Sequence, residues 1–176
     1  MKIADFDFDS LETSNPNGET ASTASLGSIV AQFAAIASEY PNRIAIEDEA
    51  DSVSFDLLDR QSNQIANFIV GLKLPDAAMI GVMTGRNRHY VAAVLGVLKS
   101  GHAFVPLDPN VPLIRRIAIA RNAVTPLILA DAKHVGDLHQ MQWRCDCVKH
   151  VMCLDHDAID SISEMPGSLM STELWD

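Results

Sequence analysis

The side chains that could bind a metal ion or act as a nucleophile gather between residues 145 and 156. They are Cys145, Cys147, His150, Cys153 and His156. Structural zinc sites favour cysteine pairs separated by two to four residues, whereas a single residue separates the first two cysteines here. Cys153 also falls in an apolar stretch that suits a strand. The pattern favours buried or half-exposed free thiols, and we assign no catalytic and no metal-binding residue.

Gly96 and Gly101 have the spacing of the two glycines in a Walker-type phosphate loop. In that loop the second glycine is followed by lysine and then by serine or threonine, which reach the phosphates and the magnesium ion. Here His102 and Ala103 follow Gly101, and Gly96 falls within an apolar helical pattern. The spacing therefore favours a small residue at a contact between helices over a phosphate-binding loop.

A second loop with a glycine runs from Gly85 to Arg88 (GRNR). It follows an apolar stretch and precedes a helical pattern, and the N-terminus of a helix can bind an anion. One turn glycine and two arginines do not match a dinucleotide-binding fingerprint. We interpret the segment as a solvated loop and assign no cofactor and no cofactor-binding residue. A free-standing small-molecule binder, supported by this loop alone, stays open as an alternative.

The composition excludes several classes of protein. A formal net charge of −10 argues against nucleic acid and against an anionic membrane surface as partners. No apolar run approaches the ~20 residues of a membrane-spanning helix. The first residues lack the basic and then apolar pattern of a secretory signal. Because three cysteines suit reduced thiols better than a disulfide framework, we expect a cytoplasmic protein.

Strand and helix patterns alternate along residues 28–154. Helices are expected at residues 29–40, 56–72, 87–100, 111–122 and 132–141, and strands at 43–47, 52–55, 79–83, around Phe104, 126–130 and 149–154. The continuous apolar runs MIGVM (79–83) and PLILA (126–130) suit strands that are buried on both faces of a parallel sheet. The alternation predicts an α/β fold, a three-layer sandwich around a parallel sheet with right-handed crossovers.

Two segments are similar to motifs of a known family. LKSGHAFVPLDP (98–109) closely resembles the adenylation-domain motif L-K-A-G-x-A-Y-V-P-L-D of nonribosomal peptide synthetases. VSFDLLDR (53–60) resembles the earlier motif L-T-Y-x-E-L-D-R of the same family, and it lies upstream at a typical distance. The resemblance implies the first part of the large subdomain of adenylate-forming enzymes, which activate a carboxylate with ATP.

The sequence contains no counterpart of the family's phosphate loop, Y-T-S-G-T-T-G-x-P-K-G, or of its later substrate and catalytic motifs. The resemblance therefore implies a truncated, non-catalytic adenylation-like domain that acts as a structural element within a modular peptide or polyketide-peptide synthase. The alternative is the N-terminal fragment of a complete adenylating enzyme, active once the missing part is present.

Three regions are expected along the chain. Residues 1–25 form a disordered acidic leader, residues 26–156 the truncated adenylation-like domain, and residues 157–176 a linker or tail towards a following domain. The ending LMSTELWD resembles segments that lead into methyltransferase domains. The expected partners are neighbouring synthase domains, such as a methyltransferase or carrier domain. We also expect an apolar face that is covered by the tail, by a neighbouring domain or by a second copy of the chain.

Overall fold

The computed structural model describes residues 28–47 and 52–154. The predicted leader (1–25) and tail (157–176) lie outside these residues, as do His156 and the apolar residues of the tail. Within the described ranges, no helix has both the length and the apolar character needed to cross a membrane.

The elements follow the predicted order, with small shifts at their ends. The helices are α1 (Ile29–Glu39), α2 (Phe55–Gly71), α3 (Arg88–Lys99), α4 (Leu113–Asn122) and α5 (Val135–Arg144), with a 3₁₀ turn at Ala132–His134. The strands are β1 (Ile44–Glu47), β2 (Ser52–Ser54), β3 (Met79–Met83), β4 (Ala103–Pro106), β5 (Leu127–Ala130) and β6 (His150–Cys153). Helix α4 begins later than predicted because the extended backbone of Pro112 (ψ 139°) places this residue at the N-cap.

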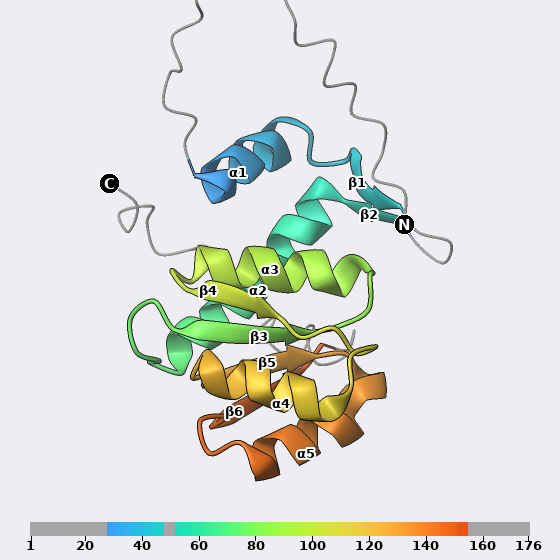
Figure 1. Ribbon diagram of the computed structural model, residues 1–176. Coiled ribbons are helices and arrows are strands. Elements are labelled where there is room, and N and C mark those ends of the chain that lie inside the picture. Colours follow the sequence, from blue (N-terminus) through green and yellow to red (C-terminus); the bar gives the residue numbers. More distant parts are fainter. Residues whose placement is uncertain (1–27, 48–51, 155–176) are drawn as a thin grey trace, which may run out of the picture.

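Strands β3 to β6 form one parallel sheet in the order β4-β3-β5-β6. The chain steps from β3 to β4 in one direction and returns past β3 to reach β5. Since parallel crossovers are right-handed, the reversal places the connecting helices on opposite faces of the sheet. Figure 1 shows α3 on one face and α4 and α5 on the other. The predicted three-layer parallel-sheet fold is confirmed.

Each face of the sheet carries its own hydrophobic core. Ile80, Val82, Leu127 and Leu129 pack with α2 and α3 on one face. Met83, Ile128 and Ala130 pack with α4 and α5 on the other face. Because successive side chains of a strand point to opposite faces, a short apolar run such as LILA (127–130) serves both cores.

Helix α1 and the antiparallel pair β1–β2 lie beyond the edge of this sandwich (Figure 1). Ser28 caps α1, because its hydroxyl oxygen accepts a hydrogen bond from the N–H of Ala31 at 3.2 Å. The apolar residues of α1 are exposed for most of its length. Ala37 is the buried residue of this helix, whereas Ile29 is 66% exposed. The reason is that α1 packs mainly against α2 and lies outside the sheet layers.

The segment LKSGHAFVPLDP is built into the interior at several points. The ammonium group of Lys99 contacts the Asp59 carboxylate at 2.6 Å and also donates to Ser62 Oγ and Asn63 Oδ1, all on α2. Burial lowers the pKa of Lys99, and the hydrogen bond and charge of Asp59 oppose that shift. The two family-like motifs therefore meet inside the protein, because Asp59 belongs to VSFDLLDR.

Two further residues of the same segment make structural contacts. His102 Nδ1 accepts a hydrogen bond from the N–H of Ala78 at 3.1 Å, and burial lowers the pKa of this imidazole, which favours the neutral form that the bond requires. Leu107 is completely buried, and its Cδ1 lies 2.7 Å from the point where a Cβ on Gly81 would stand. A leucine after β4 thus fills the space that a glycine in β3 leaves open.

Gly101 follows α3 in the left-handed conformation that glycine adopts most easily, with φ of +81°. A Cβ at this position would meet no other atom within 4 Å. We therefore expect Gly101→Ala to lower the free energy of unfolding by about 1 kcal/mol through backbone strain alone. Chemical denaturation checks this value, with Gly71→Ala as the control, because Gly71 has equal space and no positive φ. Equal stability of the two variants would contradict the strain argument.

Candidate functional site

A cavity of about 490 Å³ opens at the carboxyl ends of β3 and β4. The loop after β3 leads to α3 on one face of the sheet, and the loop after β4 leads to α4 on the other face (Figure 1). The two loops therefore diverge and leave a crevice between them, which is where open α/β sheets commonly bind ligands. Ten residues line the cavity: Val82, Thr84, Gly85, Arg86, Tyr90, Pro106, Leu107, Asp108, Pro109 and Asn110.

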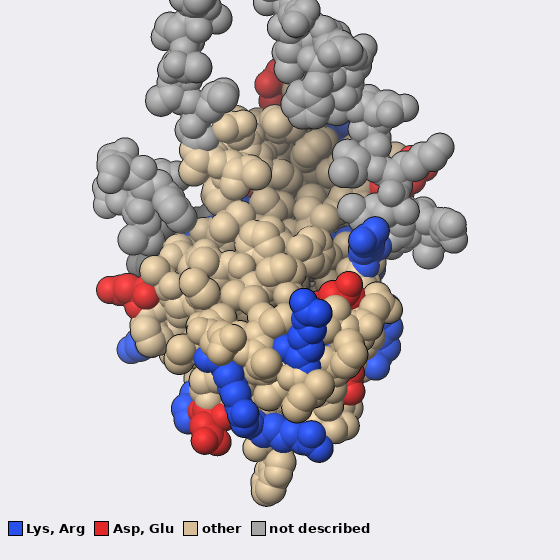
Figure 2. Space-filling view, in the orientation of Figure 1, with Lys and Arg blue, Asp and Glu red and all other residues tan. Residues whose placement is uncertain are grey.

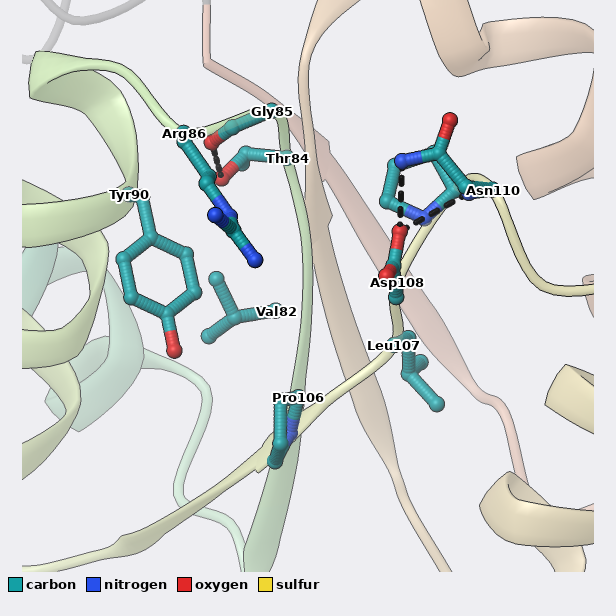
Figure 3. Close-up of a pocket in the computed structure, with 10 residues that line it drawn as sticks. Val82, Thr84, Gly85, Arg86, Tyr90, Pro106, Leu107, Asp108 and Asn110 are labelled. Atoms are coloured by element: carbon teal, nitrogen blue, oxygen red, sulfur yellow. Dashed lines mark hydrogen bonds between the residues drawn. The ribbon is translucent and has the colours of Figure 1, made fainter. Parts of the chain in front are cut away.

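The register of the sheet brings these residues together. Val82 of β3 pairs with Pro106 of β4, so that both strands end at the same level. The N–H of Leu107 then donates to the carbonyl of Val82 at 2.9 Å and extends the pairing by one residue. The polar residues that follow each strand are consequently placed on either side of the cavity. Figure 3 shows Arg86 and Tyr90 on one side and Asp108 and Asn110 on the other.

A buried carboxylate holds the loop that carries Arg86. Asp131, directly after β5, accepts hydrogen bonds at Oδ2 from the Gly85 N–H (2.9 Å) and from Asn87 Nδ2 (3.2 Å). Its Oδ1 lies 3.3 Å from His89 Nδ1. Burial by itself raises the pKa of Asp131, but the hydrogen bonds from His89, Gly85 and Asn87 outweigh it and lower this pKa below its ordinary value. The ionised carboxylate therefore fixes the β3–α3 loop beside the cavity.

The charges of the cavity come from Arg86 and Asp108. Both residues are exposed, and the structure gives no hydrogen bond or ion pair to the Arg86 guanidinium from any described residue. Asp108 Oδ1 accepts hydrogen bonds from the backbone N–H of Asn110 (2.8 Å) and from its side-chain amide (2.9 Å). The arrangement offers groups that can bind and orient a small molecule. Among the cavity residues there is no cysteine, serine or histidine for nucleophilic or general-base catalysis.

Cys145, Cys147, His150 and Cys153 do not line this cavity. Cys145 is buried, and its Sγ lies 3.1 Å from Cys147 Sγ. Burial and the hydrogen bond to Cys145 raise the pKa of Cys147 to about 11, so that the thiol stays protonated and unreactive near neutral pH. In the part of the chain that the structure describes, no three His, Cys, Asp or Glu side chains converge as metal ligands. The assignment of no metal-binding residue stays a prediction.

Gly96 does not belong to a phosphate-binding loop. It lies inside α3, and a Cβ there would stand 2.6 Å from Ile65 Cγ2 and 3.0 Å from the backbone oxygen of Ser62 on α2. The residue therefore allows close approach of the two helices, as its position in the sequence indicates. Gly85, in contrast, does lie in the β3–α3 loop, and Arg86 beside it lines the cavity.

Sequence reasoning missed Tyr90, Asp108, Asn110 and Asp131 as site residues. Asp108, Asn110 and Asp131 follow, within a few residues, the carboxyl end of a strand in the parallel sheet, whereas Tyr90 lies in the first turn of α3. That position was a usable signal, since the carboxyl ends of neighbouring parallel strands meet at one edge. The order of the strands was also needed, because it decides which of these loops become neighbours.

The sequence matches the model of the family described as AMP-binding enzyme over residues 33–175. It is 29% identical over 126 residues to one of the linear gramicidin synthase proteins of Brevibacillus parabrevis, a match that covers 72% of this chain and 2% of that protein. It is 26% identical over 136 residues to the bassianolide nonribosomal cyclodepsipeptide synthetase of Beauveria bassiana, which covers 77% of this chain and 4% of the synthetase.

The fold is similar to the crystal structure of the anthranilate CoA ligase AuaEII in complex with anthranoyl-AMP. The TM-score is 0.72 with 16% sequence identity, and the match covers 81% of this chain and 28% of the ligase. The parent family consists of AMP-forming ligases, and this chain spans only a small part of the length of the relatives it matches. The chain therefore belongs to the AMP-binding enzyme family and corresponds to the N-terminal part of a peptide-synthetase adenylation domain.

Proposed function

We propose that this chain is a structural element of a modular peptide or polyketide-peptide synthase and does not adenylate a carboxylate by itself. Its role is to support a neighbouring synthase domain, for which we favour a methyltransferase because of the LMSTELWD ending. The first reason is that residues of the two family-like motifs make structural contacts in the interior of the protein. Lys99 and Asp59 are joined in the interior, and Leu107 is buried in the core.

The chemistry of adenylation gives the second reason. Transfer of an adenylyl group develops negative charge on the phosphates, which preorganised cations and hydrogen-bond donors must stabilise. The sequence has no glycine-, serine- and threonine-rich phosphate loop and no counterpart of the catalytic lysine motif. Lys99, a cation within the best-matching motif, is surrounded by α2 side chains and is unavailable to a nucleotide.

The alternative is that the chain forms an active enzyme together with the remaining parts of an adenylation domain. The sequence matches of 26–29% to peptide synthetases favour it. In that case the structural role of the two motifs would be the same, because the Lys99–Asp59 contact would support the complete domain. The difference between the two proposals is therefore enzymatic and can be measured.

We expect the purified chain to show no amino-acid-dependent exchange of pyrophosphate into ATP above a control without protein. A complete adenylation domain, measured in parallel, serves as the positive control for the assay. Exchange above background by this chain alone would refute the proposal. If exchange appears only after the missing part of an adenylation domain is added, the alternative function is correct.

A further inference from the structure

We propose that a groove at the amino ends of β3, β5 and β6 binds the segment DFDFD (5–9) of this same chain. The groove has a volume of about 640 Å³ and is lined by the α2–β3 loop, the end of α4 and the residues that lead into β6. It lies at the opposite end of the strands from the cavity described above. The inference goes beyond the proposed function and does not depend on it.

Strained backbone is concentrated at this groove. Within residues 28–47 and 52–154, the residues other than glycine with a positive φ are Lys73 (50°), Ala77 (52°) and Val124 (49°). All three line the groove. The left-handed conformation is unfavourable for a residue with a Cβ, so that such positions are usually taken by glycine. Strain of this kind is typical of binding sites, where the surrounding structure maintains it.

Val124 gives the clearest indication of a binding partner. It follows the C-cap of α4, and the N–H of Thr125 donates to the Ala120 carbonyl at 3.0 Å, a helix ending that usually has glycine in the place of Val124. A β-branched residue in this conformation is an outlier. Val124 is 68% exposed, so contacts within the fold do little to offset the strain. Met79, which lines the same groove, is 46% exposed, and a bound segment could cover both side chains.

The charge of the groove is opposite to that of the chain. Lys73, Lys149 and His150 line it, and its lining contains no aspartate or glutamate, although the chain has a net charge of −10. Asp76 belongs to the same α2–β3 loop but does not line the groove. Among the described residues, neither lysine forms an ion pair. The complementary occupant therefore combines apolar side chains with several carboxylates.

The segment DFDFD has this composition. In an extended conformation Phe6 and Phe8 point to one side and the aspartates to the other. Both rings can then pack on Val124 and Met79, while the carboxylates stay in water within reach of the lysine charges. About 20 residues separate Phe8 from the start of α1 at Ile29. Such a length spans up to ~70 Å when extended, whereas a compact domain of this size is about 40 Å across.

The tail (157–176) fits the groove less well, although it is also acidic. It follows β6 and therefore starts from the other end of the sheet, where the strands have their carboxyl ends. The family match covers residues 33–175 and so includes most of the tail, whereas DFDFD lies before the matched range. The segment not already assigned to the family's domain is the one before α1.

The test measures contacts between aromatic rings and methyl groups in the complete chain by NMR. We expect nuclear Overhauser contacts from Phe6 and Phe8 to the methyl groups of Val124 and Met79. Replacing both phenylalanines (Phe6→Ala, Phe8→Ala) should abolish these contacts and shift the amide signals of Val124 and Lys73. The contacts should be independent of protein concentration, because the segment binds within its own chain. Contacts that grow with concentration would identify a second copy as the occupant and overturn the proposal.

A matched pair of variants tests the charges. Asp7→Asn combined with Asp9→Asn should weaken docking at least about threefold. Glu12→Gln combined with Glu19→Gln removes the same number of charges outside the segment DFDFD and should have a smaller effect. Equal effects of the two double variants would show that the carboxylates of the segment are not recognised by the groove.

A second pair of variants tests the groove itself. Val124→Gly keeps the fold, because glycine adopts the left-handed conformation freely, and it should weaken the ring contacts to Met79 at least about fivefold. Ile114→Ala is the control, since Ile114 is 70% exposed at the start of α4 and does not line the groove. The proposal is overturned if the unmodified chain shows no ring contact to Val124 or Met79, or if these two variants have equal effects.

Discussion

Replacing Lys99 with methionine is expected to lower the free energy of unfolding by about 3 kcal/mol, at the lower end of the cost of breaking a buried ion pair. The Lys99 side chain is 1% exposed and that of Asp59 is 32% exposed. Methionine keeps much of the volume of the lysine stem but has no ammonium group. Ser62 Oγ and Asn63 Oδ1 would therefore lose their donor within the α2–α3 contact.

The Lys99 ammonium also lies 5.3 Å from the centre of the Phe33 ring, so the variant loses a cation–π contact to α1. Chemical denaturation followed by circular dichroism measures the loss. Lys149→Met is the matched control, because Lys149 is exposed and its side chain has no hydrogen bond or ion pair to the described residues. A Lys99→Met variant as stable as this control would show that the buried network does not stabilise the fold.

Gly96→Ala is expected to lower the free energy of unfolding by about 2–3 kcal/mol, within the range for an overpacked core. The added methyl group would stand 2.6 Å from Ile65 Cγ2, 2.7 Å from Ile65 Cβ and 3.0 Å from the Ser62 carbonyl oxygen. Because Ile65 is 0% exposed and the carbonyl belongs to the backbone of α2, the helices must move apart to admit the methyl. That movement disturbs the core between α2, α3 and the sheet.

The control for this prediction is Gly136→Ala in α5. A Cβ at Gly136 would meet no other atom within 4 Å, and alanine has a higher helix propensity than glycine by about 1 kcal/mol. The same substitution should therefore destabilise the protein at Gly96 and leave it unchanged or stabilise it at Gly136. Thermal or chemical denaturation of both variants decides, and equal effects would contradict a close helix contact at Gly96.

Much of the element order and the fold class could be predicted from the sequence, because both depend on local patterns. The run MIGVM coincides with β3, and Ser28, Gly101 and Pro112 act at helix ends through their own backbone and side-chain preferences. The two family-like motifs were equally visible. Such patterns depend only on residues that are close together in the sequence, so they can be recognised without knowledge of the tertiary structure.

Contacts between distant residues were not predictable in the same way. Lys99 and Arg116 are charged residues that ordinary preference places at the surface, yet they are 5% and 3% exposed. Arg116 is buried because its guanidinium finds Asp137 at 2.6 Å and the Val111 carbonyl at 2.9 Å. The partner that makes burial tolerable comes from another part of the chain, and only the packing of α4 against α5 brings Asp137 there.

The cavity also combines features that the sequence determines with features that only the tertiary structure determines. The sequence by itself determined that Arg86 follows a strand and that Asp108 follows the next one, because strand ends are local features. Only the tertiary structure decided that these residues face each other. Their placement around one cavity depends on the lateral order β4-β3-β5-β6 and on the position of α3 and α4 on opposite faces. The physical reason is that right-handed crossovers and the burial of two separate apolar faces act on the whole sheet at once.

Figure 2 shows one side of the molecule. Lysine and arginine side chains lie there among uncharged surface, with a few acidic groups between them. The net charge of −10 is fixed by the sequence alone. Where the charged groups stand relative to one another is set by the packing of the helices, because α3, α4 and α5 pack apolar side chains against the two cores and leave polar side chains outside.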